Sequence, residues 1–372
     1  MSTIPMVDLK AQYALIQEEV DKNIREVLDS MAFINGPAVK SFQASLQHYL
    51  GGTEVIPCAN GTDALQIAMM ALDLQPGDEV ITADFTYVAT AEVIALLKLK
   101  PVLVDVDPVT FNIEPSAIEA AIGPKTKAIV PVHLFGQCAD MAPILALAEK
   151  HGLYVIEDTA QAIGAEYRFP DGRTAKAGTM GTIGCTSFFP SKNLGCYGDG
   201  GAIFTNDKKL ADKIRMIANH GQSVQYYHDE VGVNSRLDSL QAAVLNAKLP
   251  HLDRYNNSRA TAAAYYNAAF SDVSWLNCPQ TAQNSTHVFH QYTLQLHKDI
   301  DRQALRDHLS ALGIPCMIYY PVPLHDQKAY AQEGHYPVTE KLCATVISLP
   351  MHSELKPETL DFIIEGVKSF KP

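Results

Sequence analysis

Between residues 55 and 205, short β-branched apolar runs alternate with stretches of helical periodicity. The expected strands are 79–82, 101–106, 128–132, 154–158, 186–189 and 202–205, and the expected helices include 63–72, 89–97 and 141–151. Such alternation predicts an α/β fold, because neighbouring parallel strands need a helical crossover between them. Ligands of these sheets bind at the carboxyl ends of the strands. Functional residues are therefore expected just after each run.

The regions outside this stretch are mainly helical or mixed. An amphipathic helix is expected over residues 11–30, and residues 237–269 are mainly helical. Beyond about residue 285 the elements are shorter: a strand at 291–296 and helices at 302–312 and 357–369. A chain of 372 residues exceeds the size at which one hydrophobic core stops growing. We predict a large domain (1–250, with the N-terminal helix) and a small α+β domain (251–372).

The composition narrows the class of partner. A formal net charge of −12 leaves no basic surface of the kind that nucleic acid or an anionic membrane requires. No apolar run approaches the roughly 20 residues of a membrane span. The seven cysteines are scattered without a CxxC pair, which is typical of reduced thiols. With no signal-peptide pattern at the start, we expect a cytoplasmic protein without nucleic-acid or membrane partners.

Two polar residues suggest a cofactor. Lys192 follows an apolar run within the motif SFFPSKNLG (187–195), and Asp158 ends the expected strand 154–158. Burial would lower the pKa of the lysine amine and raise its nucleophilic fraction. A lone buried carboxylate is costly, so Asp158 should face a cation. A surface lysine and a structural salt bridge or helix cap are the alternatives. Together, the two residues meet the polar requirements of pyridoxal 5'-phosphate.

Further residues fit the same cofactor. Gly61, Thr62 and Asp63 precede a helical stretch, and Thr62 is interpreted as the N-cap. The free N–H groups of such a helix start bind phosphate, although an ordinary capped helix has the same pattern. Tyr87 could cover a planar ring instead of packing in a core, and Gln161 could reach the cofactor's phenolic oxygen instead of being a plain helix residue.

Two other classes of site are not supported. His287 and His290 have a metal-like spacing, but their neighbours suggest a strand and no carboxylate or cysteine completes a ligand set, so no metal is expected. The glycines at 178, 181 and 184 do not form GxGxxG, and residues 199–201 lead into a strand. The fingerprint of a nicotinamide oxidoreductase is therefore missing.

Four motifs, at residues 60–65, 157–161, 187–195 and 232–238, occur in an order that resembles the DegT/StrS family of sugar-nucleotide aminotransferases. The similarity runs from about residue 4 to 365. Residues 58–63 and 196–204 most resemble a subgroup that aminates UDP-2-acetamido-2-deoxy-3-keto-glucuronic acid, on the route to bacterial surface polysaccharides such as lipopolysaccharide. The resemblance implies fold type I of the pyridoxal phosphate enzymes: a seven-stranded mixed sheet, a small C-terminal domain, and a homodimer with shared active sites.

The resemblance also implies roles. Lys192 would be the cofactor-linked lysine, and Asp158 would face the pyridinium nitrogen. The other implied cofactor-binding residues are Gly61, Thr62, Asp63, Tyr87, Gln161, Ser187 and, from the neighbouring subunit, Asn234. Arg236, Tyr319 and Tyr320 would bind substrate, with Tyr319 standing where the subgroup has histidine. L-glutamate (giving 2-oxoglutarate) and a UDP-linked keto sugar are the implied partners.

Three alternatives share this fold. A 3- or 4-aminotransferase for a dTDP- or UDP-linked keto-6-deoxyhexose would share all these motifs. A sugar dehydratase would usually carry histidine in place of Lys192. A regulatory member would have lost Lys192 or Asp158, and both are present.

Overall fold

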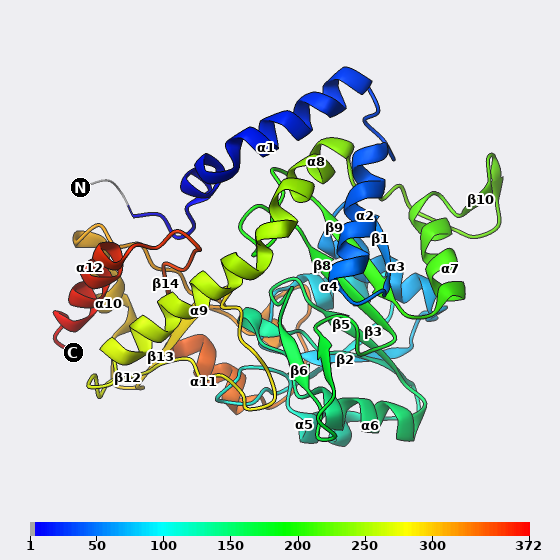
Figure 1. Cartoon of the computed structure of the whole chain (residues 1–372). Helices are drawn as coiled ribbons and strands as arrows, with labels where there is room; N and C mark the ends of the chain where they lie inside the picture. The colour runs from blue at the N-terminus through cyan, green and yellow to red at the C-terminus, as the bar shows by residue number, and fades with distance from the viewer. Residues whose placement is uncertain (1–3) are drawn as a thin grey trace.

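The computed structural model describes residues 4–372, and a seven-stranded sheet lies at its centre (Figure 1). The strand order is β1-β9-β8-β5-β4-β2-β3. The strands are β1 (Glu54–Cys58), β2 (Glu79–Ala83), β3 (Lys100–Val104), β4 (Thr126–Val130), β5 (Tyr154–Asp158), β8 (Ile183–Ser187) and β9 (Gly201–Thr205). Strand β9 is antiparallel to both neighbours, whereas β3, β2, β4, β5 and β8 pair in parallel. The expected mixed α/β sheet is confirmed.

Helices cover both faces of this sheet. On one face, α3 (Gly61–Ala71), α4 (Ala89–Leu96) and α7 (Lys208–Ala218) share a core with the strands. On the other, α5 (Pro115–Ala121) and α6 (Met141–His151) do so, together in the lower part of Figure 1. Successive strand residues pack on opposite faces of the sheet: Val80 lies in the core with α3, α4 and α7, and Ile81 lies in the core with α5 and α6. Because both faces are buried, these strands are continuous apolar runs in the sequence.

Some boundaries differ from the sequence expectation. The strand expected at 186–189 is instead Ile183–Ser187, because the chain turns after Ser187 and the Phe188 amide bonds to the Gly200 carbonyl. The strands expected to reach 106 and 132 end at Val104 and Val130. Strand β1 and helix α2 (Pro37–Tyr49) were not expected. Strand β1 lies at the sheet edge and contains a proline, which weakens the strand signal.

The C-terminal part has its own small sheet. The helices α8 (Ser239–Lys248) and α9 (Leu252–Ala269) flank the turn η2 (Leu249–His251), where the predicted domain boundary falls. The strands β12 (Leu276–Asn277), β13 (Tyr292–Leu296) and β14 (Val346–Leu349) pair antiparallel. The helices α10 (Arg302–Ala311), α11 (Pro337–Thr345) and α12 (Pro357–Lys368) complete this part, to the left in Figure 1. A separate buried cluster, including Tyr266 and Leu294, forms its core.

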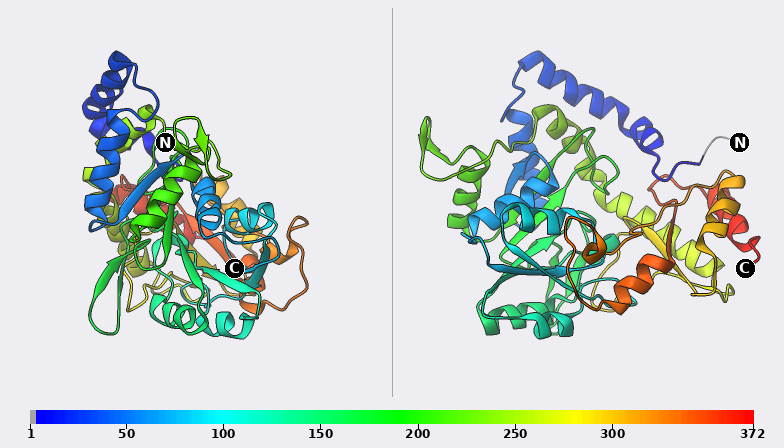
Figure 2. Two further views of the ribbon diagram at one scale, coloured as in Figure 1. Left: turned by 90° about the vertical axis from the view of Figure 1, so that its right-hand side faces the viewer. Right: turned by 180° about the vertical axis from the view of Figure 1, so that it is seen from behind.

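The N-terminal helix contacts both parts, because its Gln12 Nε2 also donates to Ser353 Oγ of the C-terminal part at 3.3 Å. Helix α1 (Leu9–Ser30), which confirms the helix expected at 11–30, packs Ile16 and Val20 against Val244 and Ala247 of α8. Figure 2 shows α1 along one side of the molecule, and in its right-hand view the hairpin of β10 (Gln222–Val224) and β11 (Tyr227–His228) projects on the side away from the chain ends. A second hairpin joins β6 (Glu166–Arg168) and β7 (Thr174–Lys176). Within residues 4–372 no helix combines the length and apolar character needed to span a bilayer.

Candidate active site

The site lies where β5, β8 and the start of α3 meet at the carboxyl edge of the large sheet. Asp158 is the last residue of β5, Ser187 is the last of β8, and Gly61 is the first of α3. A Cβ added at Gly61 would lie 2.7 Å from the Cβ of Ser187. This approach leaves no room for a side chain at position 61. The glycine therefore allows the helix start and the serine hydroxyl to form one small cradle.

The N-cap of α3 is Asn60, and the interpretation of Thr62 as the cap was wrong. The Asn60 Oδ1 accepts a 2.8 Å hydrogen bond from the Asp63 amide, and Asn60 has extended backbone as it leaves β1. Thr62 is the second helical residue, beside the Gly61 cradle. The amides of Gly61 and Thr62 lie in the first turn, and the hydroxyls of Thr62 and Ser187 add donors. A helix start with these donors suits a phosphate group.

Lys192 lies in the loop between β8 and β9. Its amide donates to the Phe189 carbonyl at 2.8 Å, which tightens the turn that carries it. Burial lowers the pKa of the Lys192 amine to about 8, although the Asp158 carboxylate opposes this shift. A substantial fraction of the amine is therefore neutral near pH 8, as a nucleophile for an aldehyde requires.

Asp158 is 7% exposed, and its carboxylate has two hydrogen-bond donors. Thr90 Oγ1 donates to Oδ2 at 3.0 Å, and the Ala160 amide donates to Oδ1 at 3.1 Å. Neither donor is charged, so the carboxylate still suits a cation such as a protonated pyridine nitrogen. The sequence reasoning missed Thr90. Its place in the first turn of a helix that follows β2 at the same sheet edge was the available signal.

Gln161 joins distant parts of the chain. Its Oε1 accepts from the Phe135 amide at 2.7 Å, and its Nε2 donates to the Tyr320 hydroxyl at 3.0 Å. Phe135 belongs to the turn η1 (Leu134–Gly136) and has a positive φ of 56°, for which the sequence gave no signal. Burial raises the pKa of Tyr320, so its hydroxyl stays protonated. The predicted role of Gln161 toward a phenolic oxygen stays a prediction.

Aromatic rings form a wall beside these groups. Tyr87 is 57% exposed in the turn between β2 and α4, with its ring centroid 6.3 Å from that of Tyr320. Phe85 is 1% exposed and packs edge-to-face on Tyr320, with the ring centroids 6.0 Å apart, so Phe85 is a core residue. The Tyr319 ring lies 6.1 Å from that of Tyr320. The exposed face of Tyr87 is free to cover a planar ring.

Asn234 and Arg236 lie on the segment between β11 and α8. Ser235, between them, accepts a 3.0 Å hydrogen bond from the Ala59 amide, which attaches this segment next to the start of α3. Asn234 is exposed, and Arg236 is partly exposed. Their predicted roles toward a partner subunit's cofactor and toward a substrate stay predictions.

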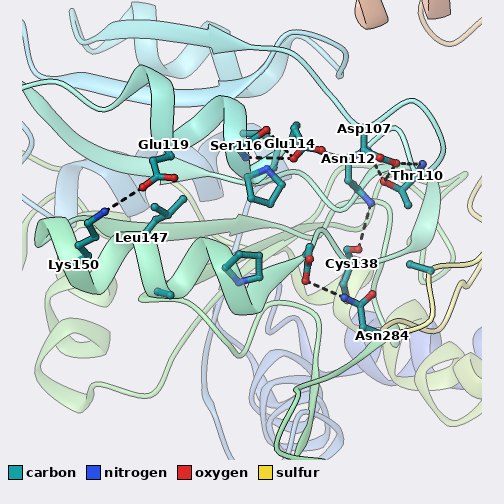
Figure 3. Close-up of a pocket in the computed structure, with 16 residues that line it drawn as sticks. Asp107, Thr110, Asn112, Glu114, Ser116, Glu119, Cys138, Leu147, Lys150 and Asn284 are labelled. Carbon is teal, nitrogen blue, oxygen red and sulfur yellow. Dashed lines mark hydrogen bonds and ion pairs between the residues drawn. The ribbon is translucent and has the colours of Figure 1, made fainter.

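The remaining candidates lie elsewhere. His287 and His290 are buried, and His287 accepts from the Phe289 amide at 3.0 Å and stacks on the Phe289 ring. Across residues 4–372 no cluster of three histidine, cysteine, aspartate or glutamate residues could hold a metal ion. A surface pocket between α5 and α6 (Figure 3) is separate from the site. Its Lys150 pairs with Glu119 at 3.1 Å, so its main cation is already engaged.

A buried carboxylate, an amine of lowered pKa and a glycine cradle at a helix start define a pyridoxal phosphate enzyme of the α/β class. The donor set fits the cofactor in three places: phosphate at the cradle, ring nitrogen at Asp158 and aldehyde at Lys192. The chain belongs to the DegT/DnrJ/EryC1/StrS aminotransferase family, whose sequence profile matches residues 14–368. It is therefore an aminotransferase that uses pyridoxal phosphate.

Known proteins resemble this chain over its whole length. It is 48% identical to UDP-2-acetamido-2-deoxy-3-oxo-D-glucuronate aminotransferase of Pseudomonas aeruginosa, covering 97% of this chain and 98% of that protein. It is 47% identical to the pleiotropic regulatory protein of Geobacillus stearothermophilus, and the match covers 99% of this chain and 98% of that protein. Among solved structures, the chain matches DesV of S. venezuelae, which was determined in complex with a ketimine intermediate. The TM-score is 0.94 at 39% identity, and the match covers 99% of this chain and 98% of that chain.

Proposed function

We propose that this aminotransferase transfers the amino group of L-glutamate to the C3 ketone of a UDP-linked 2-acetamido-3-keto uronic acid. The observation that carries the proposal is full-length similarity, at 48% identity, to the Pseudomonas enzyme named for this substrate. We place the reaction in the cytoplasm, in the biosynthesis of a bacterial surface polysaccharide such as lipopolysaccharide. Products are 2-oxoglutarate and the 3-amino sugar nucleotide.

Each of the three site residues acts on a different atom of the cofactor or the donor. Pyridoxal phosphate, when bound, supplies an electron sink and carries the amino group between donor and acceptor. Lys192, whose pKa is about 8, accepts the proton from the α-carbon of glutamate and delivers it to the C4′ carbon of the cofactor. Asp158, fixed by Thr90 and the Ala160 amide, holds a proton on the ring nitrogen through its charge. Gln161 orients the ring through its phenolic oxygen.

The acceptor sugar contacts residues from both parts of the chain. Tyr319 and Tyr320 come from the C-terminal part; the Tyr320 ring lies beside that of Tyr87, and the Tyr319 ring lies beside that of Tyr320. We assign the sugar carboxylate to Arg236, because a guanidinium offers it a two-pronged hydrogen bond. We further propose a homodimer in which the exposed Asn234 reaches the neighbouring subunit's cofactor phosphate.

Two other functions make different predictions. A regulatory protein is suggested by the name of the Geobacillus relative, but this chain keeps both Lys192 and Asp158 in a site suited to catalysis. An aminotransferase for a dTDP- or UDP-linked keto-6-deoxyhexose would use the same site without a partner for a carboxylate. Because Arg236 offers a cation for the carboxylate, it favours a uronate as the acceptor.

The test has a donor step and an acceptor step. Protein reconstituted with pyridoxal phosphate should absorb in the visible, and glutamate alone should bleach this band and release one 2-oxoglutarate per site. Lys192→Ala serves as the control without this response. The bleached protein is then offered the 3-keto uronate, its 6-hydroxy analogue and a keto-6-deoxyhexose, each nucleotide-linked. Return of the band fastest with the uronate supports the proposal, and a faster return with the 6-deoxy sugar overturns it.

A further inference from the structure

Two carboxylates at neighbouring strand ends attach the C-terminal part to the large sheet. Asp84 directly follows β2, and Asp105 directly follows β3. Both bind chain segments more than 230 residues away, between residues 324 and 339. In Figure 2 the orange segment that contains these residues lies against the cyan region of the large sheet. Neither carboxylate takes part in the chemistry described above.

Asp84 holds the turn η3 (Leu324–Asp326) at three points. Its main-chain carbonyl accepts from the Leu324 amide at 3.2 Å, Oδ1 accepts from the His325 amide at 2.8 Å, and Oδ2 lies 2.6 Å from His325 Nδ1. Because a carboxylate only accepts, Nδ1 carries the proton in this bond. Burial raises the pKa of Asp84, which is 1% exposed, and the bonds from His325 oppose that rise. The His325 ring also packs on Tyr336 at 4.6 Å.

Asp105 fixes the far end of the same segment. Its Oδ2 accepts from the Val338 amide at 2.9 Å, and its Oδ1 accepts from the Thr339 amide at 2.9 Å and the Thr339 hydroxyl at 2.8 Å. These residues form the first turn of α11, whose own N-cap residue, Tyr336, makes no side-chain cap. A carboxylate from the large sheet therefore caps a helix of the C-terminal part. The stretch between the two attachments is bound at both ends.

The position of Asp84 links this attachment to the active site. Tyr87 lies three residues after Asp84, and Tyr320 lies five residues before His325. The rings of Tyr87 and Tyr320 are 6.3 Å apart, and Tyr320 reaches Gln161. The bond between Asp84 and His325 therefore joins the backbones that carry the two aromatic sides of the site.

We propose that His325 is a positioning residue that, through Asp84, sets the separation between Tyr87 and Tyr320 and thereby the affinity for the acceptor sugar nucleotide. The identity of the acceptor rests on the proposed function, whereas the attachment itself does not. Tyr87 covers the cofactor ring in both half-reactions, whereas only the larger sugar nucleotide must also fit against Tyr320, which the attachment holds in place. Weakening the attachment should therefore act on the acceptor half of the reaction.

The first experiment compares variants at position 325. In His325→Ala the bond to Asp84 is lost, and KM for the acceptor sugar nucleotide should rise at least tenfold while kcat falls less than threefold. The rate of bleaching by glutamate should stay within about twofold of wild type. His325→Asn places an amide N–H near the position of Nδ1–H and should recover most of the affinity. His335→Ala, which removes an exposed histidine of the same segment, is the matched control.

The second experiment needs no substrate. Hydrogen exchange of the cofactor-loaded protein should show faster exchange of residues 317–326 in His325→Ala and wild-type exchange in His325→Asn and His335→Ala. Faster exchange with an unchanged KM would overturn the link to affinity. An equal loss of rate in the donor and acceptor half-reactions would show that His325 is only structural. So would a KM for the acceptor that His325→Asn does not restore. If no keto sugar is accepted by the wild type, the proposed function fails, while the exchange result still decides whether His325 fixes the segment.

Discussion

The hydroxyl of Tyr320 accepts a 3.0 Å hydrogen bond from Gln161 Nε2, across 159 residues of sequence. Gln161 follows β5 of the large sheet, whereas Tyr320 belongs to the segment between α10 and α11. The bond brings a residue of the C-terminal part within reach of the predicted ring position. The site is thus assembled from both parts of one chain, before any contribution from a second subunit.

Tyr320→Phe should lower kcat/KM for the acceptor about fivefold. The ring and its packing on Phe85 remain, and only the hydrogen bond to Gln161 is lost, which is worth about 1 kcal/mol. Steady-state kinetics with saturating glutamate measure the effect. Tyr265→Phe is the control, because it removes an exposed hydroxyl bonded to Asp361 at 2.6 Å, outside the site. An equal loss in both variants would contradict a role at the site.

Cofactor capture should depend on pH through Lys192. Because burial lowers the pKa of this amine to about 8, the neutral fraction reaches one half at about pH 8 and levels above about pH 9. The rate at which cofactor-free protein links pyridoxal phosphate should follow the same curve, measured by the growth of the visible band. With an ordinary lysine the rate would keep rising toward pH 10.5.

Borohydride reduction should then fix the cofactor on the peptide that contains Lys192. Lys248 is a matched control, because burial also lowers its pKa to about 8. Its amine, however, donates to the Gly195 carbonyl at 2.6 Å and it is 1% exposed, so it should remain unlabelled. Labelling of Lys248 or any other lysine in place of Lys192 is incompatible with the assignment.

Asp158→Asn should bind cofactor but lose several orders of magnitude in kcat. Asparagine keeps an oxygen for Thr90 Oγ1 but removes the charge that holds a proton on the ring nitrogen. Thr90→Val, which leaves the charge and removes one bond, should cost much less. Single-turnover bleaching by glutamate measures both. A rate for Asp158→Asn within about tenfold of wild type, or ~1.4 kcal/mol, would contradict this role.

The sequence predicts Asp158 and Lys192 as a catalytic pair because each residue sits at the end of an apolar run. Burial lowers the pKa of Lys192 as expected and Asp158 ends β5, while their catalytic roles stay predictions. The α/β fold follows from the alternation of strands and helices, and the family resemblance supplied the mixed sheet. The contacts that fix the site residues could not be predicted. The Thr90 bond and the Phe135 amide depend on which strand ends are neighbours, and that order is set by tertiary packing. The cap at Asn60 was missed because several residues near a helix start can serve as caps.

A composite site should show complementation between subunits. If Asn234 reaches a partner's cofactor phosphate, Asn234→Ala and Lys192→Ala proteins should each be inactive, and mixing them should restore activity. The mixed dimer holds one site with both defects and one with neither. Activity should approach about a quarter of the wild-type value at equal mixing, since half the dimers are mixed and each has one intact site. Demonstrated subunit exchange without recovered activity would count against the shared site.

The last prediction concerns the sugar carboxylate. A protein with a formal net charge of −12 repels a nucleotide sugar that carries a further carboxylate, so preference for a uronate needs a dedicated cation. Arg236 is partly exposed beside the exposed Asn234, at the predicted subunit boundary. Arg236→Ala should raise KM for the 3-keto uronate roughly 30- to 1,000-fold, equivalent to about 2–4 kcal/mol, and leave KM for the 6-hydroxy and 6-deoxy analogues nearly unchanged.

Arg173→Ala is the matched control, because it removes the same charge from an exposed arginine paired with Asp171. It should leave KM unchanged for all three sugars. If Arg236→Ala loses the same factor on each sugar, Arg236 is a structural residue, such as one half of a salt bridge between subunits. If the wild type prefers the 6-deoxy sugar, the uronate assignment falls and the keto-6-deoxyhexose becomes the acceptor. Only a rise in KM that is confined to the uronate identifies Arg236 as the residue that binds the carboxylate.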